Sequence, residues 1–494
     1  MKNLHRQNYL GWIGLMPENS KKKHAIVIGG GITGLAASYR LQQEAVLRNI
    51  PLDVTLLEAT GRVGGVIQTE HRDGFLVEHG PDAFISTKPA AKTLCEELDI
   101  ADQFIGTNPK VRRSFVVRKG TLHPVPEGFY MMAPGALKPF LKTPLFSWRG
   151  KLRMALDLFI PRRERDIDEA VAHFVRRRLG TEAFTRIAQP MIGGIYTSDA
   201  ENLSLKATFP RFLEMEKTHG SIIKALRAQK KQATETSRDT SGPRYSLFLS
   251  FKSGMQTLID TLGDILADSI RLNTRVEHIQ QDVERTGWCV ALSTGETLNS
   301  ELLCIALPAV QTSALVQRIS NPLATKLNEI PYASSATVNL AFRRTDIIHP
   351  LDGMGFVVPA TESLSLIGCS FSSVKFENRA PEEHVLLRAF VGEPISKNAE
   401  TDLIQLCQAD LMPLLGIENA PLFATVRKHT QAMAQYQVGH QDVVGDIERL
   451  TRELQGLALA GNGYHGIGIP DCIRSGETAA ISLLDAFCEA AHES

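Results

Sequence analysis

The sequence predicts an α/β fold whose main domain is assembled from segments far apart in the chain. Near the N-terminus, the apolar run HAIVIGG is followed by glycines and then by the helical pattern ITGLAASYRLQQEAVL. The same order of apolar run, glycine-rich turn and helix recurs near the C-terminus in LALAGNGYHGIGIPDCIRSGETAA. Between the two ends, segments such as ATVNLAFRR and HVLLRAFVG are rich in strand-forming residues.

The composition is that of a globular protein with more than one domain, because the chain has 494 residues and 43% of them are hydrophobic. Lys and Arg balance Asp and Glu at 54 each, so the composition gives no reason to expect a nucleic-acid partner. The seven cysteines have no metal-binding spacing, which favours core thiols in a reducing compartment and no metal site. No apolar run reaches the roughly 18 residues of a transmembrane helix. We therefore expect a cytoplasmic protein, with peripheral membrane contact left open.

The turn after the first apolar run fits the dinucleotide-binding pattern G-x-G-x-x-G at Gly29, Gly31 and Gly34. The first glycine permits the tight turn, the second lets the backbone approach a pyrophosphate, and the third lets helix and strand pack closely. The N–H groups at the start of the helix attract the anion. We expect a Rossmann-like domain here, with cofactor contacts from Gly29, Gly30, Gly31, Ile32, Thr33 and Gly34.

A second strand, DVTLLEA, ends at Glu58, 24 residues after Gly34. A carboxylate at this position accepts hydrogen bonds from ribose hydroxyls and disfavours a 2′-phosphate. Glu58 and the adjacent Ala59 are therefore predicted to contact the ribose side of the cofactor. Since strand, glycines, helix and acidic strand end occur in the required order, a dinucleotide site is favoured over a glycine-rich turn without a ligand.

The residues that follow distinguish two cofactors. In ATGRVGGVIQTEHRDGFLVEHGPDAF, Arg62 can place a guanidinium near a phosphate, and Gly64 and Gly65 allow close backbone approach. GFLVEHGPDAF is predicted to be a strand leading to a turn beside the cofactor ring, formed by Gly80, Pro81, Asp82 and Ala83. With its G-R-x-G-G motif, the sequence resembles the FAD-dependent amine oxidase and porphyrinogen oxidase superfamily, which implies FAD rather than NAD.

The C-terminal glycine-rich segment completes the expected site. It is predicted to be a strand at 457–460, a turn, and a helix from about Pro470. The resemblance implies that this helix points its N-terminus at the flavin ring and pyrophosphate, with contacts from Gly461, Gly468, Ile469 and Pro470. It also implies that the backbone of Val276 meets the adenine. Asp471, inside the first turn, is interpreted as favouring the helix dipole rather than as a catalytic acid.

Four segments narrow the resemblance: GIGIPDCI, GPDAF, IGGIYTSD and AMAQYQVGH. Together they resemble the Gram-positive-type porphyrinogen oxidases of haem biosynthesis, from about Lys23 to the end. The resemblance implies six-electron oxidation of a porphyrinogen, most simply coproporphyrinogen III, by FAD and molecular oxygen with release of hydrogen peroxide. Protoporphyrinogen IX is the alternative substrate, and an amine oxidase is a more distant one. Flavin N5 carries the chemistry, so no catalytic side chain is assigned.

A porphyrinogen requires a wide, mostly aliphatic pocket with cations for its propionates. Lys88 is the first candidate cation, with Arg112 and Arg113 behind it; a solvated surface charge is the alternative for each. Gly194, Ile195 and Tyr196 lie in an uncharged segment without helical periodicity that resembles the family's pocket wall, although Ile195 also suits a core. Transient contact with other haem-pathway enzymes is left open.

The expected domains follow from these segments. Residues 1–20 are expected to be a disordered extension, because MPENSKKKHAIVIGGG from Met16 looks like a complete beginning. The expected FAD-binding domain comprises 21–86, 250–310 and 425–494, with accessory-sheet strands in SIRLNTRVEHIQQD and WCVALSTGETLNSELLCIALP. The substrate-binding domain comprises 87–107, 206–249 and 311–424. Residues 108–205, with basic stretches, form a helical domain that either contacts membranes or presents a solvated face. A flexible excursion is expected at 230–246.

Overall fold

The computed structural model describes residues 22–163, 167–197, 200–236, 246–282, 287–393 and 397–493. The expected N-terminal extension lies outside these residues, as does most of the excursion expected at 230–246. The first part of that excursion belongs to helix α11 (Ile222–Thr236).

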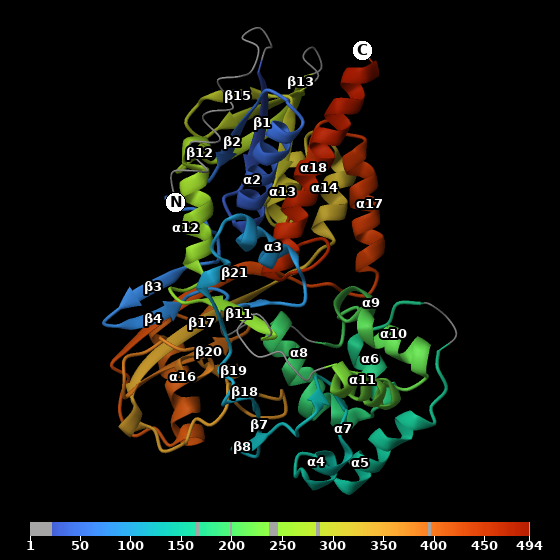
Figure 1. The fold of residues 1–494 in the computed structure, drawn as a ribbon, viewed down its shortest axis with the longest axis vertical. Coiled ribbons are helices and arrows are strands. Elements are labelled where there is room, and N and C mark those ends of the chain that lie inside the picture. The colour runs from blue at the N-terminus through green and yellow to red at the C-terminus, as the bar shows by residue number, and fades with distance from the viewer. Residues whose placement is uncertain are drawn as a thin grey trace.

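A five-stranded parallel sheet organises the upper part of the molecule (Figure 1). Its order is β12-β2-β1-β16-β22, so strands from both ends of the chain lie two positions apart. The strands are short and apolar because helices or a second sheet cover both faces. They are β1 (Lys23–Ile28), β2 (Leu52–Leu57), β12 (Ile270–Arg271), β16 (Leu302–Ile305) and β22 (Leu457–Leu459).

Strand β1 shows how the two faces are filled. Ala25 and Val27 pack into one core with the helices on one side, whereas Ile26 and Ile28 pack into another core on the opposite side. The first layer contains α2 (Ile32–Leu47), α3 (Ala90–Glu97), α12 (Gln256–Ile265) and α18 (Ile469–Glu493). The second contains β13 (Val276–Asp282), β14 (Gly287–Leu292), β15 (Thr297–Ser300), α13 (Ala309–Val316), α14 (Asn321–Asn328) and α17 (His440–Arg452).

A seven-stranded mixed sheet lies below this domain, with α16 (Glu400–Leu415) on its far side (Figure 1). Alternate side chains of its central strands pack with α16 into one apolar core. The remaining side chains face the other way and are more polar. In order across the sheet the strands are β21 (Phe423–Ala434), β17 (Tyr332–Arg343), β20 (His384–Val391), β19 (Leu366–Phe371), β18 (Gly355–Val357), β7 (Phe115–Arg118) and β8 (Thr121–Pro124).

A separate core of helices lies beside this sheet (Figure 1). Its most buried charge is Arg178, which is fully enclosed and lies 2.6 Å from Asp157. The helices are α4 (Leu137–Lys142), α5 (Trp148–Ala155), α6 (Val171–Arg178), α7 (Thr181–Ala183), the π-helix η3 (Phe184–Ala188), α8 (Gln189–Tyr196), α9 (Leu205–Thr208), α10 (Pro210–His219) and α11.

Small sheets and one short helix connect these three parts. The hairpin β3 (Thr69–Arg72) and β4 (Phe75–Glu78) extends from the upper domain (Figure 1). The other elements are β5 (Phe84–Ile85), β6 (Phe104–Gly106), β9 (Phe129–Tyr130), β10 (Ala133–Pro134), β11 (Phe248–Phe251) and α15 (Ser372–Lys375).

The packing differs from the expected domain boundaries in several places. Strand β16, expected in an accessory sheet, lies inside the parallel sheet between β1 and β22, because its four buried apolar residues suit a strand covered on both faces. The helices α13 and α14 pack with it rather than with the substrate-side sheet. Strands β7 and β8 interrupt the region expected to be helical, and β21 belongs to the seven-stranded sheet. The helices α10 and α11 join the helical core.

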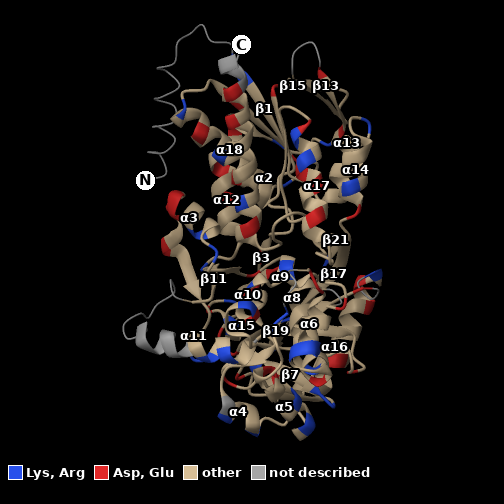
Figure 2. Ribbon diagram, turned by 90° about the vertical axis from the view of Figure 1, so that its right-hand side faces the viewer, with Lys and Arg blue, Asp and Glu red and all other residues tan. Residues whose placement is uncertain are grey.

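Charges of both signs are interspersed over the ribbon (Figure 2), as the equal counts of acidic and basic residues suggest. No helix among the described residues combines the length and the apolar character needed to cross a membrane.

Candidate functional site

The glycine-rich turn between β1 and α2 is shaped by two close contacts and one open position. Gly29 has φ +107°, and a Cβ atom on Gly34 would lie 1.9 Å from its carbonyl oxygen. These glycines therefore permit the turn and the tight packing of helix on strand. A Cβ atom on Gly31 would meet nothing within 4 Å. The turn is thus open at Gly31, directly before Ile32 and Thr33 begin α2.

Glu58 lies at the end of β2, beside this turn. Its Oε2 accepts a hydrogen bond from the backbone N–H of Gly30 at 2.8 Å, and its Oε1 accepts from the N–H of Thr60 at 2.8 Å. The Thr60 hydroxyl also donates to Oε1 at 2.7 Å. A carboxylate has about four acceptor positions, so one remains for a ribose hydroxyl. The segment leading to Val276 runs alongside, since the Thr274 N–H donates to the Glu58 carbonyl. Ala59 is exposed beside it.

The loop after β2 closes on the glycine turn. The N–H of Gly64 donates to the carbonyl of Gly30 at 2.7 Å, and a Cβ atom on Gly65 would lie 3.3 Å from the Cα of Gly31. Arg62, predicted to lie near a phosphate, donates to the carbonyls of this same loop, at 3.0 Å for Val63. Its guanidinium therefore holds the loop in shape.

The turn at 80–83 follows β4 and packs against the first loop. A Cβ atom on Gly80 would lie 1.8 Å from the carbonyl oxygen of Val66, so only glycine allows this approach. The carboxylate of Asp82 lies 2.9 Å from Lys375. Burial opposes its ionisation, but the charges of Lys375 and Arg388 outweigh burial and lower the pKa of Asp82 to about 2. Pro81 and Ala83 are partly buried on either side.

The C-terminal loop brings a second helix start to the same place. The sequence predicts a helix from about Pro470, and α18 begins at Ile469. Gly461 and Gly466 have φ near +140°, and the carbonyl of Gly468 accepts a hydrogen bond from the N–H of Cys472 in the first turn of α18. The helices α18 and α2 pack side by side (Figure 1), so their N-terminal ends converge.

Helices α2 and α18 approach closely at one more glycine. A Cβ atom on Gly476 would lie 2.3 Å from the carbonyl oxygen of Thr33, within the first turn of α2. The open position at Gly31, the carboxylate at Glu58 and two helix N-termini therefore surround one region. This arrangement fits an elongated dinucleotide with an anionic centre.

The predicted substrate residues take two different positions. The Lys88 ammonium lies 2.5 Å from Asp471, whose side chain is only 4% exposed, so the expected propionate partner is already paired. Gly194, Ile195 and Tyr196 lie in α8, which corrects the expectation of a non-helical segment. Packing into the helical core overrides the weak helix propensity of the two glycines. Ile195 is 45% exposed, whereas Tyr196 is buried.

The seven-stranded sheet presents a polar face beside the turn at 80–83. In the register of the sheet, Asn339 on β17 lies opposite both Arg388 on β20 and Thr425 on β21. Asn339 and Arg388 are at most 5% exposed. Among the described residues, Asn339 Oδ1, Arg388 Nε and Thr425 Oγ1 are buried without a hydrogen-bond partner. Unpartnered buried polar atoms are rare in proteins, and a bound ligand or water accounts for them.

A cavity of about 580 Å³ lies between the helical core and the seven-stranded sheet. Gly392 on its wall directly follows β20 and is four residues, or roughly 13 Å of extended chain, from Arg388. This size is within the range of small-molecule sites. The lining includes Phe184, Gln189, Gly193, Val358, Ile367 and Gly392.

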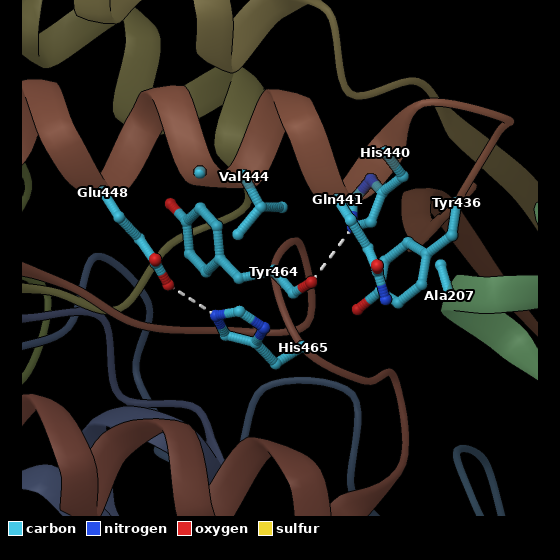
Figure 3. Close-up of a pocket in the computed structure, with 9 residues that line it drawn as sticks. Ala207, Tyr436, His440, Gln441, Val444, Glu448, Tyr464 and His465 are labelled. Carbon is cyan, nitrogen blue, oxygen red and sulfur yellow. Dashed lines mark hydrogen bonds and ion pairs between the residues drawn. The ribbon is translucent and has the colours of Figure 1, made fainter. Parts of the chain in front are cut away.

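A smaller cavity, of about 160 Å³, lies behind the C-terminal loop (Figure 3). His440 stacks on Tyr436 there at 3.9 Å, and His465 pairs with Glu448. The Tyr436 hydroxyl accepts the N–H of Gly466 and donates to the carbonyl of Asn462. These contacts support the loop from behind.

A Rossmann-like sheet with two converging helix starts, next to a second sheet with a polar face, defines a dinucleotide-dependent flavoprotein oxidoreductase. The model of the family described as flavin containing amine oxidoreductase matches residues 32–484. The chain belongs to this family, and its cofactor is FAD.

Curated relatives match almost the whole chain. A coproporphyrinogen III oxidase of Propionibacterium freudenreichii is 34% identical, with 94% of this chain and 91% of the relative aligned. The coproporphyrinogen III oxidase of Bacillus subtilis (strain 168) is 32% identical, with 94% and 98% aligned. A crystal structure from Exiguobacterium sp. 255-15, proposed to be a protoporphyrinogen oxidase, has a TM-score of 0.83 at 29% identity and covers 95% of this chain and 100% of that one.

The sequence did not identify the polar residues of the second sheet. Asn339 and Arg388 interrupt the apolar strands ATVNLAFRR and HVLLRAFVG. Such residues in the middle of a buried strand need partners, and this signal could have marked the face. The ion pair between Lys88 and Asp471 joins residues 383 positions apart, which no local pattern indicates.

Proposed function

We propose that the protein oxidises a porphyrinogen to the corresponding porphyrin in haem biosynthesis, with coproporphyrinogen III as the preferred substrate. The observation that carries the proposal is the similarity to two coproporphyrinogen III oxidases over 94% of the chain. A cavity of about 580 Å³ between the helical core and the seven-stranded sheet supports a bulky substrate.

Bound FAD supplies a two-electron oxidant, so removing six electrons and six protons takes three rounds. With three molecules of oxygen as acceptors, the balance gives one porphyrin and three molecules of hydrogen peroxide. The protein has to bind and orient the macrocycle. The apolar lining from Phe184, Val358 and Ile367 suits the ring, and Arg176 in the same lining, which pairs with Glu201, suits a carboxylate.

Anaerobic mixing tests the proposal directly. The purified holoenzyme is mixed with coproporphyrinogen III, protoporphyrinogen IX or a panel of amines, and the flavin absorbance near its visible maximum is followed. We expect rapid bleaching by coproporphyrinogen III and slower bleaching by protoporphyrinogen IX. Bleaching by neither porphyrinogen would refute the proposal. Admitting air should then restore the flavin absorbance and release peroxide.

Protoporphyrinogen IX remains the second candidate, because the structure from Exiguobacterium is proposed to be a protoporphyrinogen oxidase. The two substrates differ in having propionates or vinyl groups on two of the pyrroles. A higher kcat/KM for protoporphyrinogen IX than for coproporphyrinogen III would select it. Turnover of an amine, but of neither porphyrinogen, would place the chain with the amine oxidases.

We further propose that α4, α5 and the turn after them contact an anionic membrane surface. Trp148, Leu152, Leu156 and Phe159 have spacings of four, four and three residues and are 51 to 80% exposed. The basic residues Lys138, Lys142 and Arg149 on α4 and α5 are also exposed. A solvent-exposed apolar stripe bordered by cations favours the interface of an anionic bilayer.

Co-sedimentation with vesicles tests this surface. We expect binding to phosphatidylglycerol vesicles but not to phosphatidylcholine vesicles, and loss of binding when Trp148→Ser and Phe159→Ser are combined. Leu47→Ser, which alters an equally exposed apolar residue on α2 (72% exposed), serves as the control. Equal binding of parent and double variant would refute the membrane contact.

A further inference from the structure

Side chains from the seven-stranded sheet donate hydrogen bonds to the backbone carbonyls of the turn after β4. The amide Nδ2 of Asn339 donates to the carbonyl of Glu78 at 3.3 Å. The imidazole Nε2 of His429 lies 2.9 Å from the carbonyl of His79. Because a carbonyl can only accept, Nε2 of His429 carries the proton.

The carbonyls of the next residues of the turn also accept hydrogen bonds from buried side chains. Arg388 donates to the carbonyl of Gly80 through Nη2, and its Nη1 lies 3.6 Å from the Asp82 carboxylate. The hydroxyl of Ser250 donates to the carbonyl of Asp82 at 2.7 Å. Lys375 holds the carboxylate of Asp82 at 2.9 Å.

The donors therefore come from four strands, β17, β21, β20 and β11, and bind the carbonyls of 78, 79, 80 and 82. A surface loop normally presents its carbonyls to water. Here the carbonyl edge is turned toward the sheet and fixed there, so the opposite edge of the turn has a defined position. A rigid turn can hold a ring in one orientation without being ordered by the ligand.

Charged side chains of both signs surround the turn. Lys375, Arg379 and Arg388 face the carboxylates of Glu78 and Asp82. In addition, the Glu70 carboxylate lies 2.8 Å from Nε2 of His79. Arg388 is 5% exposed, and Arg379 is 2% exposed. Buried charges act strongly because solvent does not screen them.

We propose that Asn339, His429 and Arg388 are positioning residues that fix the turn at 78–82 against the flavin, and that the buried positive charge of Arg388, held at the Gly80 carbonyl, raises the midpoint potential of the bound flavin. This inference rests on the proposed contact between FAD and the turn at 80–83. A positive charge near the flavin favours its reduced form, which holds more electrons.

The effect of the Arg388 charge is tested by measuring the midpoint potential of the flavin. The purified holoenzyme is titrated spectroscopically with a reference dye, without any porphyrinogen. Arg388→Met retains an unbranched side chain and removes the charge. We expect the ratio of reduced to oxidised flavin at a fixed potential to fall at least tenfold, which is a lowering of about 30 mV for a two-electron couple. Arg388→Lys retains the charge and should keep the parental potential.

Arg344→Met is the matched control. Arg344 follows β17 at the end away from the turn and also donates to loop carbonyls, those of Ile347 at 2.6 Å and His349 at 3.0 Å. Its loss should lower thermal stability without changing the flavin potential. Equal potentials for Arg388→Met and the parent, or equal shifts for Arg344→Met and Arg388→Met, would overturn the assignment of the charge.

Asn339→Leu tests the positioning role without changing the charge. It removes the donor to Glu78 and retains the volume of the side chain. We expect the dissociation constant for FAD, measured by fluorescence titration of the apoprotein, to rise about tenfold, and the vibronic structure of the bound flavin spectrum to broaden. Unchanged affinity and an unchanged spectrum would contradict the positioning role of Asn339. A parent chain that binds FAD but oxidises no porphyrinogen would instead refute the proposed function alone.

Discussion

Lys88 shows how a partner elsewhere in the chain modifies the role expected for a residue. Its side chain is 51% exposed, while its partner Asp471 is buried and also lies 3.2 Å from Arg474. A buried carboxylate requires a positive neighbour. Lys88 therefore compensates Asp471 at the start of α18, and any charge it offers to a substrate is shared.

We predict that Lys88→Ala raises KM for coproporphyrinogen III about fivefold with a smaller effect on kcat, since a half-exposed ion pair contributes roughly 1 kcal/mol. Steady-state kinetics with a range of substrate concentrations measures both constants. Lys92→Ala, which removes an exposed pairing with Glu96 on α3, should leave KM unchanged. A KM for Lys88→Ala equal to that of the parent would return Lys88 to a purely structural role.

His429 is predicted to make the stability of the fold depend on pH. Burial lowers the pKa of His429 to about 4 from 6.5. Because the unfolded chain binds the proton more readily, stability is complete above pH 6.5 and declines as the pH falls toward 4. The loss should be on the order of 1 to 3 kcal/mol.

The variant His429→Gln tests this dependence, because its amide can still donate to the His79 carbonyl but cannot titrate. Between pH 6.5 and 4.5, the midpoint of thermal unfolding should fall less steeply in the variant than in the parent. Parallel pH profiles for the two proteins would show that another group causes the decline.

At the scale of single residues, the sequence predicted those positions whose backbone geometry demands glycine. Gly29, Gly34 and Gly80 have neighbours that exclude a Cβ atom. The contacts that the sequence did not predict, such as Asn339 with Glu78, depend on strands 261 residues apart. Only the assembled sheet brings these groups together.

At the scale of elements, the pairing of α2 with α18 determines how the two helix starts meet. Gly476 faces Thr33 and Ala37 across this contact, and a Cβ atom would be 2.3 Å from the Thr33 carbonyl. Any side chain at 476 must separate the helices. The separation would displace the start of α2 from the glycine turn before it.

We expect Gly476→Ala to destabilise the fold by about 1 to 3 kcal/mol and to weaken FAD binding. Chemical unfolding and flavin content after gel filtration measure these effects. The control is Gly445→Ala in the middle of α17, where a Cβ atom meets nothing within 4 Å. That change should be neutral or stabilising by up to about 1 kcal/mol. Similar losses in both variants would contradict the role of the helix contact.

Helices with strong patterns were predicted well. The segment ITGLAASYRLQQEAVL coincides with α2, and the start of α18 was predicted within one residue. In contrast, α8 was missed because Gly193 and Gly194 obscure its periodicity. A proline near its N-terminus and the surrounding helical core stabilise it nevertheless.

At the scale of the whole molecule, helix starts from both ends of the chain converge on one region, so we expect the binding of FAD and the stability of the fold to be coupled. We predict that FAD at 100 times its dissociation constant stabilises the apoprotein by about 2.7 kcal/mol and raises the unfolding midpoint. Differential scanning fluorimetry over a range of FAD concentrations measures the shift. Glu58→Ala should need higher FAD concentrations for the same shift. A midpoint independent of FAD would contradict the shared site.

The order of the strands in the parallel sheet could not be predicted from the sequence. The sequence indicated which segments form the Rossmann-like domain, but β16 was expected in an accessory sheet. Four apolar residues, LLCI, fit either location, and only the neighbours β1 and β22 distinguish them. The cavity near Gly392 likewise depends on how the helical core rests against the sheet.

The position of β22 at the edge of the parallel sheet has a consequence for biosynthesis. Strand β16 pairs with β22 on one side, and β22 is made only after residue 456 has been added. While the ribosome is still translating the preceding 150 residues, β16 exposes an unpaired backbone edge, which invites association with other nascent chains.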